Sequence, residues 1–127
     1  MNQAKKRVLI VEDEAPERMA LVRKIEQAGF ETLEAKDGVE GLKSALENHP
    51  DLVLSDIILP KLDGIKLVEQ LREDAWGKGV PVIFLTNLSD PEKTAEASKQ
   101  GVSDFLIKSD SRLEEVVALV RKKIGDG

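Results

Sequence analysis

Several residue types that carry chemistry are missing from this chain of 127 residues. It has no cysteine and no tyrosine, and its only histidine is His49. The lack of cysteine excludes disulfides, thiolate catalysis and cysteine-based zinc sites, and it fits a reducing compartment. A single histidine excludes multi-histidine metal sites, and we expect His49 to be an ordinary residue of the turn before Pro50. Aromatic residues make up 3% of the chain, so the predicted core is aliphatic.

The chain also lacks long apolar runs and clusters of basic residues. Its longest apolar runs, such as residues 8–11 and 80–85, are far shorter than the roughly 20 residues of a membrane helix. Three acidic residues at 12–14 end the first run too early for a signal peptide. The net charge is −5, whereas binding to DNA phosphates needs clustered Lys and Arg. We therefore expect a cytoplasmic protein with no membrane segment and no direct nucleic-acid partner.

What the sequence does contain is a regular alternation of short apolar runs and amphipathic stretches. The runs predict five strands, at Arg7–Val11, Glu31–Ala35, Leu52–Ser55, Pro81–Leu85 and Ser103–Ile107. The stretches predict five helices: Pro16–Ala28, one from an Asp37 N-cap to Asn48, Gly64–Arg72, one starting at Pro91, and Leu113–Ile124 with Ser111 and Glu114 as a capping box. This alternation predicts a single α/β domain over residues 1–127 (core about 6–124), with a parallel sheet and helices on both faces. An eight-stranded barrel needs roughly twice as many residues, so we expect an open doubly wound sheet.

Polar side chains follow four of the five predicted strands. Glu12 and Asp13 come after the first strand, Asp56 after the third, Thr86 after the fourth and Lys108 after the fifth. In an open parallel sheet, ligands bind beyond the carboxyl ends of the strands, so these groups share one rim. Any one of them alone has an ordinary structural explanation, but three carboxylates together repel one another unless positive charge lies among them. A hard divalent cation with oxygen ligands, Mg²⁺ or Mn²⁺, meets that need.

The same groups are suited to phosphoryl transfer, which depends on positioning and charge neutralisation more than on covalent assistance. One oxygen of Asp56 can contact the metal while the other attacks phosphorus and forms an acyl phosphate. Lys108 can neutralise one phosphoryl oxygen, and the Thr86 hydroxyl can donate a hydrogen bond to another. The sequence therefore predicts a phosphoacceptor site centred on Asp56.

Four segments resemble the receiver domain of bacterial two-component response regulators. They are VLIVEDE at 8–14, DIILPKLDG at 56–64, FLT at 84–86 and DFLIK at 104–108, and they occur in the family's order and on the expected strand ends. The resemblance extends from Lys6 to about Ile124. It implies a flavodoxin-like fold with strand order 2-1-3-4-5.

The resemblance also implies roles for individual residues. Asp56 would be the phosphoacceptor, with Thr86 and Lys108 assisting, and Mg²⁺ would be held by Glu12, Asp13, Asp56 and the backbone carbonyl of Ile58. Thr86 and Phe105 would form a switch pair that responds to phosphorylation.

Partners and activity follow from the same resemblance. The phosphoryl group would come from a sensor histidine kinase, a phosphotransfer protein or a small acyl-phosphate donor. The surface of the fourth helix, fifth strand and fifth helix would then contact a downstream protein, with the chain acting as a monomer or a phosphorylation-dependent dimer. The protein would not be an enzyme, since it would catalyse only its own phosphorylation and slow dephosphorylation.

The sequence departs from the family pattern at a few positions around the site. Ser109 replaces the usual proline of a cis peptide, which raises the question whether the Lys108–Ser109 bond is cis, and Asn87 replaces a small residue. Ile58 and Leu88 are apolar where polar side chains could position a water, so we predict slow loss of phosphate. Phe105 lacks the hydroxyl of a tyrosine, so the switch would act through packing.

Three other functions are known for folds of this kind. The departures at Asn87 and Ser109 leave open a receiver-like interaction module that works without phosphorylation. A phosphatase with an aspartyl-phosphate intermediate would need an acid–base Asp at the position of Ile58. A flavin carrier of the same fold would be disfavoured because the acidic residues 12–14 would repel a phosphate.

Overall fold

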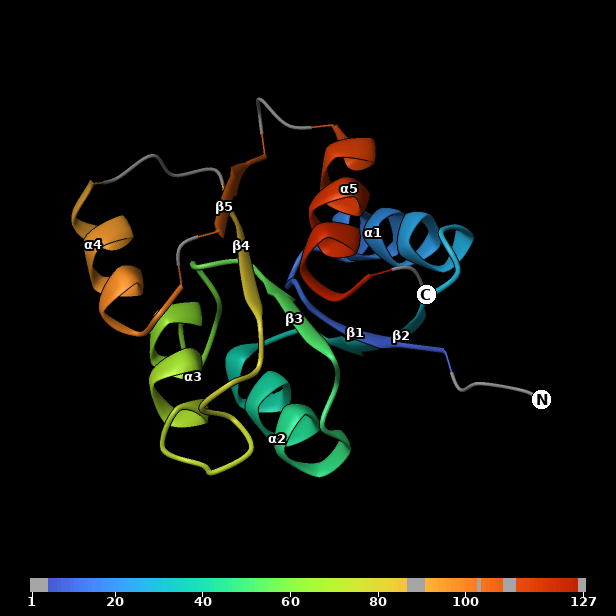
Figure 1. The fold of residues 1–127 in the computed structure, drawn as a ribbon. Coiled ribbons are helices and arrows are strands. Elements are labelled where there is room, and N and C mark those ends of the chain that lie inside the picture. The colour runs from blue at the N-terminus through green and yellow to red at the C-terminus, as the bar shows by residue number, and fades with distance from the viewer. Residues whose placement is uncertain (1–4, 87–90, 103, 109–111, 126–127) are drawn as a thin grey trace.

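The computed structural model describes residues 5–86, 91–102, 104–108 and 112–125, with the side chain of Thr86 excepted. Five parallel strands form one sheet in the order β2-β1-β3-β4-β5, as predicted. The strands are β1 (Arg7–Val11), β2 (Glu31–Ala35), β3 (Leu52–Ser55), β4 (Val82–Thr86) and β5 (Asp104–Ile107). The helices are α1 (Ala15–Gln27), α2 (Gly38–Asn48), α3 (Gly64–Leu71), α4 (Pro91–Lys99) and α5 (Leu113–Ile124). The fold is therefore the flavodoxin-like doubly wound sheet (Figure 1).

Helices cover both faces of the sheet because the buried strand residues point alternately to opposite sides. On one face Val8 and Ile10 of β1 belong to an apolar cluster with residues of α1 and α5. On the other face Leu9 and Val11 belong to a cluster with residues of α2, α3 and α4. Figure 1 shows α1 and α5 together on one side of the sheet and the other three helices on the opposite side. The central strands β1 and β3 are buried on both faces, which explains their nearly continuous apolar runs.

Two helices, α2 and α3, begin at aspartates whose side chains cap them. The side chain of Asp37 accepts a hydrogen bond from the Glu40 N–H at 2.8 Å, which confirms the predicted cap of α2. Asp63 caps α3 in the same way. A Cβ on Gly64 would lie 2.2 Å from the carbonyl oxygen of Asp56, so only glycine lets α3 start this close to the end of β3. The Asp63 cap and the close approach at Gly64 thus hold the start of α3 near Asp56.

Some predicted boundaries were wrong by one or more residues. β4 begins at Val82 rather than Pro81, because proline has no N–H to donate to a strand ladder. α1 spans Ala15–Gln27 rather than Pro16–Ala28, since proline is tolerated inside the first turn. The N-cap of α5 is Arg112, which makes no side-chain cap hydrogen bond; its N–H donates to Glu115 Oε1 at 3.4 Å, so Glu115 rather than the predicted Glu114 reaches back to the start of the helix. The predicted cap Ser111 lies outside the described residues.

Within these ranges, none of the helices is both long enough and apolar enough to cross a membrane.

Candidate functional site

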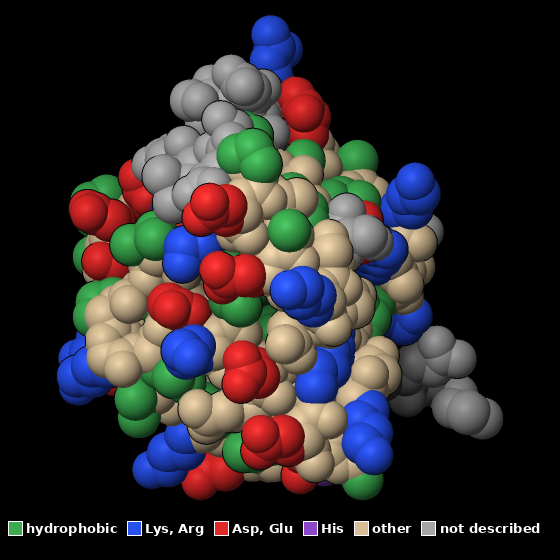
Figure 2. Space-filling model, turned by 90° about the vertical axis from the view of Figure 1, so that its left-hand side faces the viewer, with side chains coloured by type: hydrophobic (Ala, Val, Ile, Leu, Met, Phe, Trp, Pro, Cys, Tyr) green, Lys and Arg blue, Asp and Glu red, His purple; other side chains and the backbone are tan. Residues whose placement is uncertain are grey.

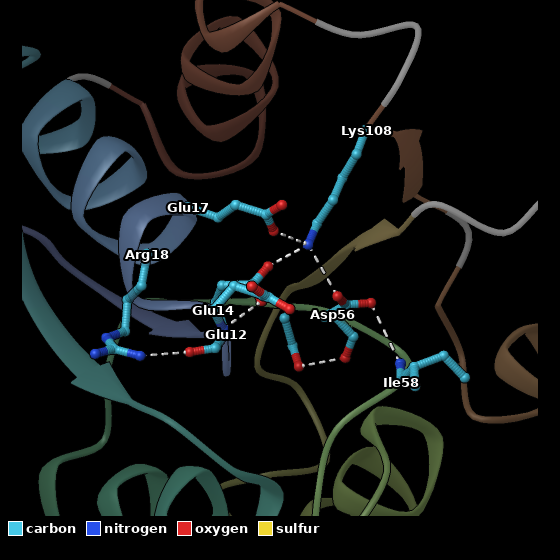
Figure 3. Close-up of polar contacts among 8 residues, drawn as sticks. Glu12, Glu14, Glu17, Arg18, Asp56, Ile58 and Lys108 are labelled. Atoms are coloured by element: carbon cyan, nitrogen blue, oxygen red, sulfur yellow. Dashed lines mark hydrogen bonds and ion pairs between the residues drawn. The ribbon is translucent and has the colours of Figure 1, made fainter.

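The backbone ladder of the sheet positions the first acidic residues of the rim. The Glu12 N–H donates to the Ala35 carbonyl at 3.0 Å, and the Asp56 N–H donates to the Val11 carbonyl at 3.1 Å. Both residues are therefore held one step beyond the paired strands β1 and β3. Lys108 follows β5, two strands away from β3 in the sheet order. Of the predicted rim, Glu12, Asp56 and Lys108 thus lie close together in the structure (Figure 3).

Glu12, Asp13 and Asp56 form a carboxylate cluster suited to a hard cation. Each offers one carboxylate oxygen, and these oxygens all lie within 4.8 Å of one another. Glu12 is buried and Asp13 is exposed, with Asp56 between these extremes. All-oxygen donors with one exposed side match the chemistry of Mg²⁺, which keeps several water ligands when bound to protein. The residues present therefore fit the predicted metal.

The ammonium group of Lys108 bridges carboxylates from three segments of the chain (Figure 3). Its Nζ donates to Asp56 Oδ2 at 2.9 Å and to Glu17 Oε2 at 2.8 Å, and it also contacts Glu12 Oε1. The Lys108 side chain is only 14% exposed, so water screens these contacts weakly. One cation thus balances part of the negative charge that collects at the rim.

Burial and pairing shift the pKa values of these groups. Burial raises the pKa of Glu12 above its ordinary value, although Lys108 and the Glu14 N–H oppose the shift. For Lys108, burial by itself would lower the pKa, but the hydrogen bonds to Glu12, Glu17 and Asp56 outweigh it and raise the pKa. The hydrogen bond from Lys108 lowers the pKa of Glu17. Lys108 is therefore fully charged at neutral pH.

The two carboxylate oxygens of Asp56 have different partners. Oδ2 accepts from Lys108, whereas Oδ1 accepts from the Ile58 N–H at 3.2 Å. The Ser55 hydroxyl donates to the Asp56 carbonyl at 2.8 Å and steadies the backbone at this point. Ile58 lies beside Asp56 with its side chain 53% exposed. Metal ligation by the Ile58 carbonyl stays a prediction.

The predicted switch pair is described in part. Phe105 is half-buried on β5, and its ring lies 5.8 Å from that of Phe84 with an interplanar angle of 32°. The backbone of Thr86 pairs with Ile107, but its hydroxyl lies outside the described part of the structure.

Three departures from the family pattern also fall outside the described residues. They are Asn87, Leu88 and Ser109, so the geometry of the Lys108–Ser109 peptide bond stays an open question.

Sequence reasoning missed Glu17 as a member of the site. It lies in the first turn of α1, where an acidic residue is ordinarily explained by the helix dipole. No spacing rule links it to Lys108, which is 91 residues away in the chain.

A doubly wound sheet with a carboxylate cluster at the carboxyl ends of its strands defines a class of α/β proteins that bind ligands at this rim. Within that class, residues 8–121 match the profile of the response regulator receiver domain family. The transcriptional regulatory protein PrrA of Mycobacterium tuberculosis is 39% identical over 115 residues, which are 91% of this chain and 48% of that protein. The chain belongs to the response regulator receiver domain family of two-component signalling, whose members are signalling domains rather than true enzymes.

Two solved structures are similar over nearly the whole chain. The chemotaxis protein CheY4 of Vibrio cholerae is 28% identical, with a TM-score of 0.88, and the match covers 94% of this chain and 99% of that one. The receiver domain of the sensor histidine kinase PA1611 from Pseudomonas aeruginosa is 26% identical, with a TM-score of 0.87, and the match covers 97% of this chain and 100% of that one. That structure has a magnesium ion coordinated in its active site cleft. By contrast, the chain spans about half the length of curated relatives such as PrrA.

Proposed function

We propose that this receiver domain accepts a phosphoryl group on Asp56 in a Mg²⁺-dependent reaction, from a histidine kinase, a phosphotransfer protein or a small acyl phosphate. The observation that carries the proposal is the contact of Lys108 Nζ with Asp56 Oδ2 at 2.9 Å beside the cluster of Glu12, Asp13 and Asp56. This arrangement supplies a nucleophile, a cation for the transferred group and a metal-binding cluster at one point of the rim.

The chemistry of the transfer follows from these groups. A carboxylate oxygen of Asp56 forms a bond to phosphorus, while the bond from phosphorus to the histidine nitrogen or acyl oxygen of the donor breaks. The donor keeps the electron pair of that bond as its leaving group. Mg²⁺ held by Glu12, Asp13 and Asp56 would neutralise charge on the phosphoryl oxygens. Lys108, which already contacts Asp56, would neutralise a further oxygen.

The environment of Asp56 supports slow loss of the phosphoryl group. The side chain two residues after Asp56 is Ile58, which is exposed and apolar. It has no group that could hydrogen-bond to a water and direct it at phosphorus. We therefore expect the phosphorylated form to last for minutes or longer, and a half-life of seconds in the presence of Mg²⁺ would contradict this.

A protein partner would read the phosphorylated state at the surface formed by α4, β5 and α5. Phe105 lies on β5 of this surface and packs near Phe84 of the core, and Lys123 of α5 pairs with Asp104 of β5 at 2.5 Å. Figure 2 shows the side of the molecule on which α3 and α4 lie, where acidic and basic side chains are interspersed. A mixed surface of this kind suits a protein partner better than a nucleic acid, which needs a continuous basic surface.

The test is incubation with acetyl phosphate and Mg²⁺ followed by intact mass spectrometry, with Asp56→Asn as the matched control. One phosphate adduct on the wild type and none on the variant is the expected result. A wild type that binds Mg²⁺ but gains no adduct would overturn the proposal in favour of a receiver-like module that works without phosphorylation.

A further inference from the structure

The ammonium group of Lys108 has three carboxylate partners, and they are not equivalent. Glu12 and Asp56 belong to the cluster suited to a cation, whereas Glu17 does not. A cation at the cluster would compete with Lys108 for Glu12 and Asp56, because each carboxylate oxygen that binds the metal is withdrawn from the amine. Glu17 is then the described partner that the amine can keep.

We propose that Glu17 is a positioning residue that holds the Lys108 ammonium when Glu12 and Asp56 turn to the cation. This inference rests on the proposed function, because holding the amine at the rim is useful only if a phosphoryl group arrives there to pair with it. The contact between Glu17 Oε2 and Lys108 Nζ at 2.8 Å carries it.

The backbone of Glu17 is fixed relative to the rim. The neighbouring Arg18 donates from its guanidinium to the Glu12 carbonyl at 2.8 Å, and its N–H donates to the Glu14 carbonyl at 2.9 Å. Arg18 Nε also pairs with Glu34 at 3.2 Å. These contacts tie the first turn of α1 to the end of β1, as Figure 3 shows for Arg18 and Glu12, and to Glu34 of β2. Glu17 is therefore held within reach of Lys108, while its side chain stays 47% exposed and able to adjust.

The molecule has room for the amine on the Glu17 side. A hollow of about 200 Å³ is lined by Glu17 and Lys108 together with apolar side chains of α1, β4 and α5: Ala20, Leu21, Leu85, Leu113 and Val116. The metal-suited carboxylates are not part of this lining. An ammonium displaced toward these apolar side chains would lose part of its hydration. The carboxylate of Glu17 offsets part of that loss, so it favours the cation-bound arrangement.

The test measures Mg²⁺ affinity by isothermal titration calorimetry on wild type, Glu17→Gln and Glu14→Gln. Glu14 is a matched control because it is an exposed carboxylate of the same segment and is not among the described partners of Lys108, which are Glu12, Glu17 and Asp56. The three proteins are then remade in a Lys108→Met background to complete a double-mutant cycle.

We expect Glu17→Gln to weaken Mg²⁺ binding by roughly three- to fivefold, which is the upper part of the range for an exposed ion pair. Glu14→Gln should weaken it by less than about twofold, because only a screened charge is lost. In the Lys108→Met background the two substitutions should have equal effects. Equal effects in the wild-type background, or an undiminished Glu17 effect without Lys108, would overturn the inference.

The outcomes separate this inference from the proposed function. A wild type that binds Mg²⁺ and shows the Glu17–Lys108 coupling, but gains no phosphate, would overturn the proposed function alone. A wild type that is phosphorylated but shows no coupling would overturn the inference alone. No Mg²⁺ binding by the wild type would overturn both.

Discussion

Two half-buried cations lie at opposite ends of the sheet, and each is surrounded by oxygen atoms of a different kind. At the amino ends of the strands, the Arg72 guanidinium donates to the backbone carbonyls of Gln100, Gly77 and Val80 at 3.0, 2.6 and 2.8 Å. At the carboxyl ends, Lys108 contacts only side-chain carboxylates among its described partners. The first set of partners belongs to the main chain, whereas the second set can rotate away.

This difference distinguishes a structural cation site from the proposed phosphoacceptor site. Backbone carbonyls cannot leave without unfolding a loop, so Arg72 fixes the segments before β4 and β5. Burial lowers the pKa of Arg72, and neutral carbonyls do not reverse that shift. Around Lys108 the carboxylates do reverse it and raise the pKa. In the proposed reaction a metal ion binds the carboxylates and the lysine pairs with a phosphoryl oxygen. Both changes require that the partners of the lysine are charged and can exchange.

The largest effect is expected from Arg72→Met. The substitution leaves carbonyl oxygens of Gly77 and Val80 without their donor, and each unsatisfied buried acceptor costs about 1–3 kcal/mol. We expect a loss of about 3 kcal/mol in the free energy of unfolding, measured by urea denaturation, with no recovery on adding Mg²⁺. Recovery in Mg²⁺ would break the distinction between the two cation sites.

Lys108→Met is the counterpart at the other end of the sheet. Without the amine, the buried carboxylate of Glu12 and that of Asp56 lie close together with no cation between them, so they repel each other. We expect a loss of about 2 kcal/mol in the absence of divalent cations, most of it recovered in excess Mg²⁺ because the cation replaces the amine. The measurement is urea denaturation with and without Mg²⁺, and a variant insensitive to Mg²⁺ would contradict it.

Asp37 extends the comparison between main-chain and side-chain partners. It follows β2 at the same end of the sheet as Lys108, but its carboxylate accepts a hydrogen bond from the backbone N–H of Glu40. The Glu40 N–H lowers the pKa of Asp37 below its ordinary value of 3.8, with help from Lys61. Its stabilising contribution is therefore present above the unfolded-state pKa of about 4 and is lost as the pH falls through the lowered folded-state value. We expect Asp37→Ala to cost about 1 kcal/mol at pH 7.

Asp37→Asn is the control for this effect, since asparagine caps helices as well as aspartate does but does not titrate. Urea denaturation at pH 7 and at pH 3 should show the stability difference between wild type and Asp37→Asn shrinking at the lower pH. A constant difference would mean that the Asp37 charge has no part in the cap.

The smallest effect is expected at His49, at the same end of the sheet as Arg72. Its ring stacks on Trp76 with centroids 4.3 Å apart and an interplanar angle of 7°, and its backbone is left-handed with φ 48°. Asparagine tolerates this backbone, so His49→Asn removes only the ring contact. We expect a loss of about 0.5 kcal/mol, followed through the fluorescence of the single tryptophan. A loss as large as that of Arg72→Met would show that the stack, and not the guanidinium, anchors this end.

Much of the fold and of the rim could be predicted because the relevant signals are local. The apolar runs gave strands such as Arg7–Val11 with the correct bounds, and alternation with helices implied a parallel sheet. A parallel sheet then brings residues that follow strands to one edge, which is why Glu12, Asp56 and Lys108 could be grouped before their contacts were known. Arg72 could not be recognised in this way, because its partners are main-chain carbonyls that carry no sequence signal.

By itself, the sequence determined the order of the elements, a core that is mainly aliphatic apart from Phe30 and Phe84, and the set of groups at the strand ends, because periodicity and turn residues act over short distances. The tertiary structure alone decided which of those groups touch. It joined Glu17 to Lys108 across 91 positions, stacked His49 on Trp76, and enclosed Arg72 in carbonyls. Such contacts depend on how α1, α5 and the loops pack against the sheet, and side-chain packing between distant segments leaves no periodic pattern in a single chain.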